Sequence, residues 1–112
     1  MLARANRVVK PSDFRATVRR GRRTSTGSML VYRLERDPSD PARFGFIVAK
    51  TVGNAVERNL VRRRMRAVCR SIVDQGGRGS DVVVRALPGS AQKDWASLSA
   101  EMHAILDPAL IR

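Results

Sequence analysis

The chain has 112 residues, 43% of them hydrophobic, which is sufficient for one globular domain with a buried core. Its 22 lysine and arginine residues against ten aspartate and glutamate residues give a net charge of +12, which excludes an ordinary near-neutral surface. A single cysteine excludes an internal disulfide, and no apolar run is long enough to span a membrane. We therefore expect a cytoplasmic protein with a polyanionic partner, either a nucleic acid or an anionic membrane surface.

The first predicted element is a short helix over residues 11–21, "PSDFRATVRRG". Ser12 is positioned to cap its N-terminus, and Gly21 is positioned to end it. Phe14 and Val18 are four residues apart, which places them on one face of this helix.

Two strands follow. Residues 28–35 ("SMLVYRLE") and 44–50 ("FGFIVAK") are rich in β-branched and aromatic side chains, which favour strands. Residues 36–43 ("RDPSDPAR") contain two prolines and two aspartates, which predict a connecting loop.

The second half of the chain predicts a long helix, a strand and a last helix. Asn54 caps the long helix, which runs over residues 55–73 and is ended by the glycines of "QGGRGS". Residues 81–86 ("DVVVRA") form a continuous apolar run, typical of a strand that is covered on both faces. The last helix has apolar side chains at helical spacing and is closed by Asp107-Pro108: Trp95, Leu98, Met102 and Ile105.

This element order predicts one α/β (α+β) domain over residues 1–112, with residues 1–10 as a flexible basic N-terminus. The positive charge is unevenly distributed within it. Residues 1–36 hold ten basic and two acidic side chains (+8), and residues 50–70 hold seven basic and one acidic (+6). Residues 37–49 and 71–112 each have a net charge of −1, so two segments carry the excess.

The long helix is amphipathic in an unusual way. At about 100° per residue, an apolar face is separate from a face of guanidinium groups. Glu57 is the only acid of residues 50–70 and lies away from the arginines. A solvated face normally has glutamates that relieve such repulsion, so nucleic-acid binding is the favoured interpretation and a purely solvated face the alternative. The apolar face is Val61, Met65, Val68 and Ile72; the polar face is Arg58, Asn59, Arg62, Arg63, Arg66 and Arg70.

The segment "KTVGNAVERNLVRRRMR" resembles the signature of the bacterial ribonuclease P protein component. The similarity extends through "NRVVKPSDFRATVRRG", "LVYRL", "FGFIVAK" and "DVVVRALPGSA", in the order found in that family. The chain differs from the family pattern at three positions. Leu60 and Thr51 replace basic residues, and Val18 replaces a second aromatic residue.

The resemblance implies a two-layer α/β sandwich with a central mixed sheet, a further short strand near Thr24 and a left-handed β-α-β crossover. It implies a protein subunit that binds the catalytic RNA of ribonuclease P and the 5′ leader of precursor tRNA. The RNA removes the leader with Mg²⁺ ions that the RNA components mainly hold. No catalytic residue, metal site or organic cofactor is expected in the protein, and the complex is expected to be 1:1 rather than an obligate protein oligomer.

The resemblance also assigns site residues. The RNA subunit would contact Arg58, Asn59, Arg62, Arg63 and Arg66 on the long helix. The leader would lie in a cleft of Phe14, Val18, Tyr32 and Lys50, because aromatic rings with cations suit a single strand of any sequence.

Several alternatives remain open on the residues alone. Phe14 and Tyr32 are also suited to core packing, and periodicity does not assign the face of Tyr32. His103 is interpreted as a surface or satisfied residue, and Cys69 as a buried structural thiol. A structural RNA binder, such as a small ribosomal protein, fits the composition equally. Membrane-surface binding is poorly supported, because no apolar cluster adjoins the basic face.

Overall fold

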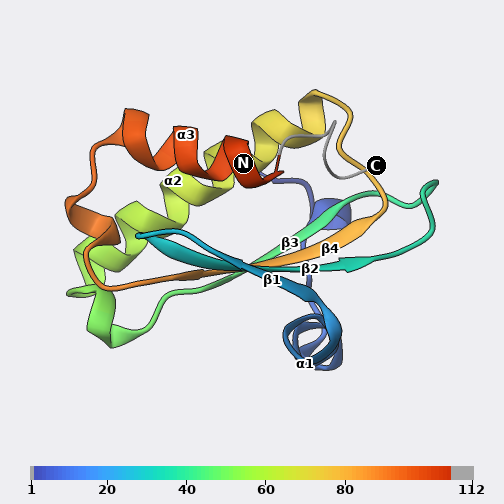
Figure 1. Cartoon of the computed structure of the whole chain (residues 1–112), viewed down its shortest axis with the longest axis horizontal. Coiled ribbons are helices and arrows are strands. Elements are labelled where there is room, and N and C mark those ends of the chain that lie inside the picture. The colour runs from blue at the N-terminus through green and yellow to red at the C-terminus, as the bar shows by residue number, and fades with distance from the viewer. Residues whose placement is uncertain (1, 107–112) are drawn as a thin grey trace.

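A four-stranded mixed sheet separates one helix from two others in the computed structural model, which describes residues 2–106 (Figure 1). The helices are α1 (Pro11–Arg20), α2 (Ala55–Asp74) and α3 (Trp95–Leu106). The strands are β1 (Arg22–Ser25), β2 (Met29–Glu35), β3 (Arg43–Ile47) and β4 (Ser80–Ala86). This order confirms the predicted α+β domain, and β1 is the short strand expected near Thr24. The expected closure of the last helix at Asp107-Pro108 lies outside the described residues.

The strand order is β1-β2-β4-β3, so the last strand of the chain lies between β2 and β3. β4 is antiparallel to β2 and parallel to β3, and α2 connects the two parallel strands. In Figure 1 the chain runs leftward along β3 at the back, returns rightward along α2 above the sheet, and runs leftward again along β4 nearer the viewer. This crossover is left-handed, as the resemblance implied and against the strong general preference for right-handed connections.

The hydrophobic core lies between the sheet and the layer of α2 and α3. Alternate strand residues point to this side, and the apolar stripe of α2 packs on them as predicted. On α3 the buried residues are Leu98, Met102 and Leu106, whereas Trp95 at the helix start is 43% exposed. Cys69 is buried in the core, as interpreted from the sequence, and burial raises the pKa of its thiol well above the ordinary value. From the sheet the core receives Met29, Val31, Phe44, Val82 and Val84; from α2, Val61, Met65, Val68 and Ile72.

Helix α1 covers part of the opposite face of the sheet and so adds a partial third layer to the sandwich (Figure 1). The predicted cap at Ser12 is wrong. Lys10 is the N-cap without a side-chain hydrogen bond, and Pro11 occupies the first helical position, where its missing N–H is no loss. Gly21 is the C-cap of the helix, as expected, in an extended conformation, and its missing side chain permits close packing. A Cβ there would lie 2.4 Å from the Thr17 carbonyl oxygen.

The N-terminal segment lies along the free edge of β3 instead of projecting into solvent over residues 2–8. Leu2 and Val8 are buried, and the Val8 amide donates to the Phe44 carbonyl oxygen at 2.9 Å. Asn6 Nδ2 donates to the Ala42 carbonyl oxygen, also at 2.9 Å. These contacts differ from the flexible N-terminus expected for residues 1–10.

A buried carboxylate, Asp81 of β4, binds an arginine of β3 and one of the loop after β2, and the arginine of β3 also reaches α1. Arg43 donates to both of its oxygens, at 2.7 and 2.6 Å, and Arg36 lies 3.3 Å from Oδ1. Arg43 Nη1 also lies 3.4 Å from Asp13 Oδ2 on α1. The hydrogen bond with Asp81 raises the pKa of Arg43. This network holds the N-terminal end of α1 against the sheet.

Candidate nucleic-acid interface

Helix α2 begins with a reciprocal cap. Asn54 Oδ1 accepts from the Glu57 amide at 2.9 Å, and Glu57 Oε1 accepts from the Asn54 amide at 3.0 Å. Gln92 Nε2 donates to the other Glu57 oxygen at 2.9 Å. The only acid near the start of the helix is therefore bound to the cap and to Gln92, and leaves the arginines uncompensated.

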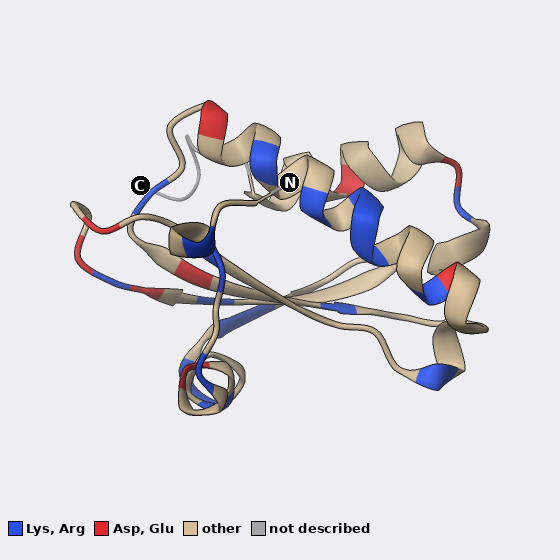
Figure 2. Ribbon diagram, turned by 180° about the vertical axis from the view of Figure 1, so that it is seen from behind, with Lys and Arg blue, Asp and Glu red and all other residues tan. Residues whose placement is uncertain are grey.

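Basic residues recur along α2 (Figure 2), and its polar face combines arginines held by hydrogen bonds with arginines whose side chains are unpaired. Arg58 Nη1 donates to the Gly53 carbonyl oxygen at 3.3 Å. Arg62 donates to Asn59 Oδ1 at 3.1 Å and to the Val48 carbonyl oxygen at 3.4 Å. Arg63 and Arg66 are exposed, and neither side chain has a hydrogen bond or ion pair with another described residue. The five predicted RNA-contact residues thus share one face.

This face is hollowed into an open groove of about 480 Å³, lined by Asn59, Arg62, Arg63, Arg66 and Ala67. The small side chain of Ala67 leaves space between the guanidinium groups. Forked guanidinium groups around an open groove suit the phosphates of a nucleic-acid backbone.

Three other arginines of α2 do not line this groove, although one of them, Arg58, lies on the same face: Arg58, Arg64 and Arg70. Arg70 pairs with Asp74 at 3.2 Å, so the expected face without a carboxylate ends at Arg66. The i,i+4 spacing of Arg70 and Asp74 could have revealed this pair from the sequence. Arg64 points toward α3 and donates to the Lys93 carbonyl oxygen at 2.9 Å.

The predicted cleft residues lie mostly on the α1 side of the sheet. Tyr32, Val83 and Gly45 are paired across β2, β4 and β3, and they point away from the core side. Phe14 packs on Gly45, where a Cβ would lie 2.5 Å from its ring. Tyr32 is only 9% exposed, so it supports this surface more than it presents a free ring.

The other two cleft residues differ in exposure. Val18 is half-buried on α1, and Lys50 is exposed in the short 3-10 helix Lys50–Val52 after β3. The Lys50 side chain forms no hydrogen bond or ion pair with the rest of the described chain. Phe14 therefore lies against the row formed by Tyr32, Val83 and Gly45, which we call the Tyr32 row. Lys50 lies beyond the end of β3.

Three residues of this side of the sheet were not predicted as site residues. Leu30, Arg85 and Ile47 are paired across β2, β4 and β3, two positions beyond the Tyr32 row, and Arg85 is exposed. We call these three residues the open row. The signal in the sequence was the alternation of "VVVRA", which places Arg85 on the same side as Val83.

Within residues 2–106, no three or more His, Cys, Asp or Glu side chains form a group that could hold a metal ion. His103 Nδ1 lies 2.9 Å from the Ser99 carbonyl oxygen, as expected of a satisfied histidine. None of the described helices is long and apolar enough to cross a membrane.

This small α+β domain has an arginine-lined groove on α2 and an exposed arginine, Arg85, on the α1 side of the sheet. Together these features are typical of a polyanion-binding protein. The family model for ribonuclease P matches residues 2–110. The chain belongs to the ribonuclease P protein family, as its signature segment predicted.

Individual relatives agree with this assignment. The ribonuclease P protein component of Clavibacter michiganensis is 47% identical over 110 residues, covering 98% of this chain and 97% of the relative. That of an Arthrobacter species is 43% identical over 112 residues, covering 100% of this chain and 82% of the relative. The RNase P protein structure from Staphylococcus aureus has a TM-score of 0.82 at 25% identity, covering 96% and 98% of the two chains. The Thermotoga maritima structure has a TM-score of 0.78 at 21% identity, covering 89% and 94%, and supports the fold.

Proposed function

We propose that this protein binds the catalytic RNA of ribonuclease P through the arginine groove of α2 and holds the 5′ leader of precursor tRNA on the α1 side of the sheet. As a member of its family, it is a protein subunit of an endoribonuclease that processes tRNA. The observation that supports the RNA contact is the groove itself, where Arg63 and Arg66 lack partners among the described residues.

We assign the chemistry to the RNA components, which would mainly hold the Mg²⁺ ions, and no catalytic residue to the protein. The protein would contribute binding energy. The proposal includes a cytoplasmic 1:1 complex of protein and catalytic RNA.

The groove proposal predicts a particular dependence on salt. The face has four arginines instead of five, because Arg70 is paired with Asp74. If each of the four neutralises one phosphate, the slope of log affinity against log salt is roughly −2.8 to −3.6.

The test is cleavage of precursor tRNA at low magnesium, with the cognate catalytic RNA, in the presence and absence of the protein. We expect strong stimulation that is lost in the variant Arg62→Ala/Arg63→Ala/Arg66→Ala, whose RNA-binding slope falls by roughly 2 to 3. The matched control Arg15→Ala/Arg19→Ala/Arg20→Ala removes the same charge from α1 and should bind the isolated catalytic RNA like the wild type. Equal losses in both variants would contradict a specific α2 site and indicate a general charge effect.

The leader contact distinguishes this function from a structural RNA binder. Phe14→Ala and Lys50→Ala should weaken binding of precursor tRNA to the holoenzyme and leave mature tRNA unaffected, because only the precursor carries a leader. Wild-type protein that binds RNA tightly but never stimulates cleavage would favour the structural RNA binder.

A further inference from the structure

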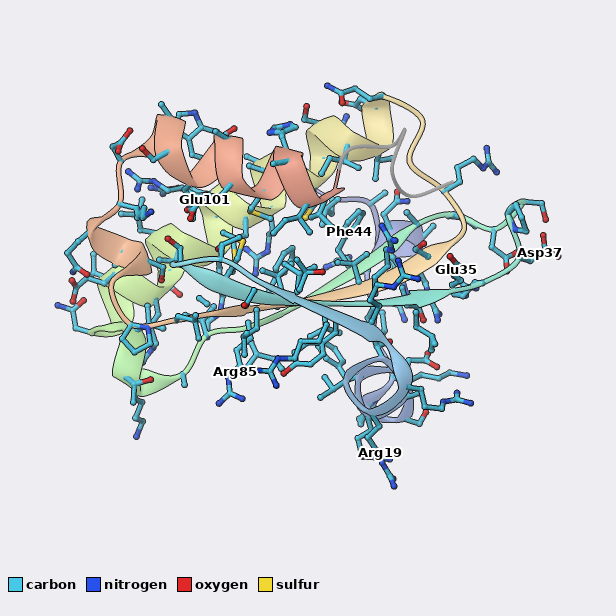
Figure 3. All side chains as sticks on the ribbon, viewed as in Figure 1. Arg19, Glu35, Asp37, Phe44, Arg85 and Glu101 are labelled. Carbon is cyan, nitrogen blue, oxygen red and sulfur yellow. The ribbon has the colours of Figure 1, made fainter. Side chains whose placement is uncertain are left out.

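The middle of the sheet presents an isolated cation on its α1 side. β4 has a strand neighbour on each side, and its side chains alternate between the two faces. Val82 and Val84 enter the core, whereas Val83 and Arg85 point the other way. Figure 3 shows Arg85 extending from the sheet toward the side occupied by α1, away from α2 and α3.

The surroundings of Arg85 are apolar. Its cross-strand neighbours in the open row are Leu30 and Ile47, and both are half-buried. The Arg85 guanidinium has no hydrogen bond or ion pair with any other residue that the structure describes. The acids of this side are already paired at the other end of the sheet, since Asp81 and Asp13 both bind Arg43.

An unpaired guanidinium between apolar side chains is poorly explained by folding alone. A salt bridge or a surface of other polar groups would normally surround a charged residue on a central strand. Apolar surface combined with isolated cations is instead the composition of sites for single-stranded nucleic acid, where bases cover the apolar part and cations meet the backbone.

The open row continues the predicted leader cleft. Arg85 and Ile47 follow Val83 and Gly45 by two residues on β4 and β3, whereas Leu30 precedes Tyr32 by two residues on the antiparallel β2. The open row therefore lies one step of about 7 Å along the sheet from the row of Tyr32, Val83 and Gly45. Lys50 follows Ile47 by three residues, at the same end of β3. The row that contains Tyr32, then Arg85, then Lys50 therefore follow one another toward one end of the sheet.

We propose that Arg85 binds a backbone phosphate of the 5′ leader and is a positioning residue of the cleft. The proposal rests on the proposed function and adds a residue that the family signature did not supply. With the aliphatic Val18 on one wall, this cleft offers fewer rings for stacking, and a phosphate contact on its floor contributes affinity that does not depend on the base.

The test compares Arg85→Ala, Arg85→Lys and the control Arg4→Ala in the holoenzyme, with precursor and mature tRNA. Arg4 is exposed in the 3-10 helix Arg4–Asn6, outside the open row, and its replacement removes the same charge. We expect Arg85→Ala to weaken precursor binding about tenfold and to reduce the salt slope by about 0.7, because one contact to a single strand is lost. Mature tRNA binding and the thermal midpoint should be unchanged, and Arg85→Lys should restore the slope.

The outcomes separate this proposal from the proposed function. Unchanged precursor binding in Arg85→Ala, with a loss in Phe14→Ala, overturns the role of Arg85 and leaves the leader cleft intact. A loss that varies with leader sequence at an unchanged salt slope overturns the phosphate assignment in favour of a base contact. If the wild-type holoenzyme does not prefer precursor over mature tRNA, the proposed function itself fails.

Discussion

Gly45 determines how closely α1 approaches the sheet. Its missing side chain leaves the space that the Phe14 ring occupies, since a Cβ would lie 2.5 Å from two ring atoms. A glycine inside a strand ordinarily weakens it, and close approach of another group is a common reason for its presence. The sequence "FGF" predicted a strand but gave no sign that its glycine receives the ring of a residue 31 positions earlier.

We predict that Gly45→Ala displaces Phe14 and loosens α1 from the sheet. Overpacking of this kind typically costs about 1–3 kcal/mol, which urea unfolding would measure. Precursor tRNA binding should fall with it, because the predicted cleft loses its aromatic wall.

The chain offers a matched control for this substitution. Gly27 has open space around its Cβ position, so Gly27→Ala should be neutral or slightly stabilising. Equal unfolding free energies for the two variants would show that the Phe14 contact does not limit the packing of α1.

At the scale of single elements, local sequence patterns correctly predicted a helix where one of its faces packs on the core. The stripe of α2 and its cap at Asn54 depend on residues three or four apart, and both are confirmed. The first helix shows the limit of this reasoning, because Pro11 at the first helical position displaced the cap expected at Ser12.

The side of the sheet on which Tyr32 lies was also not predictable, and the physical reason is different. β2 has helices on both sides, so both of its faces carry apolar residues and alternation loses its meaning. The open row was not predicted, for another reason, although the alternation of β4 places Arg85 on the same side as Val83. It is assembled from three strands whose register only the folded sheet defines.

Helix α3 supports a prediction about pH. Asp94 accepts hydrogen bonds from the Ser97 hydroxyl at 2.7 Å and from the Ser97 amide at 3.1 Å, and these bonds lower the pKa of Asp94 below 3.8. A lowered folded-state pKa stabilises the protein above the unfolded-state value, and this contribution is lost as the pH falls through the folded-state pKa.

We therefore expect Asp94→Ala to lower the thermal midpoint at pH 7, with a smaller difference from wild type near pH 3. Asp94→Asn keeps a capping oxygen without a titrating group and is the control. A difference between wild type and Asp94→Ala that is constant across this pH range would contradict the assigned role of the carboxylate.

For the whole molecule, charge repulsion is the dominant consequence of the composition. The net charge of +12 is contained within 37 × 28 × 24 Å. At 0.01 M salt the screening length is about 30 Å, so nearly all of these charges repel one another, whereas at 0.15 M it is about 8 Å. Basic residues are found on both sides of the sheet (Figure 2).

We predict that the isolated protein is partly unfolded at low salt and gains helical signal when salt is added. Sulfate should raise the thermal midpoint more than chloride at equal ionic strength, because a dianion can occupy the α2 groove of the folded state. Circular dichroism measures both effects, and the variant Arg62→Ala/Arg63→Ala/Arg66→Ala should lose most of the difference between the two salts. A signal that does not respond to sulfate would contradict this prediction.

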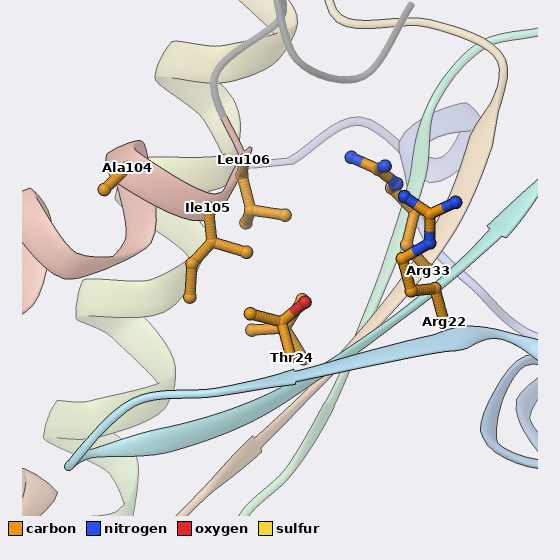
Figure 4. A pocket seen from close by; sticks show the side chains of 7 residues that line it. Arg22, Thr24, Arg33, Ala104, Ile105 and Leu106 are labelled. Atoms are coloured by element: carbon orange, nitrogen blue, oxygen red, sulfur yellow. The ribbon is translucent and has the colours of Figure 1, made fainter.

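The remaining cavity of note is lined by residues of β1, β2 and the end of α3 and has a volume of about 360 Å³ (Figure 4). It includes Arg22 and Arg33 beside Ile105 and Leu106, on the side of the sheet that faces α3. It adjoins the end of the described chain, and it lies on the opposite face from the predicted leader cleft.

The position of β4 has a consequence for synthesis on the ribosome. β2 and β3 are synthesised early but do not pair with each other. Both pair with β4, which begins at Ser80 and is synthesised later. A nascent chain that stops before this strand has only the β1–β2 hairpin and an unpaired β3, so the arginine-rich amphipathic segment of α2 emerges beside ribosomal RNA before the core that it joins is complete. Because the pairings that close the sheet are distant in the chain, folding is completed only after most of the protein has been translated.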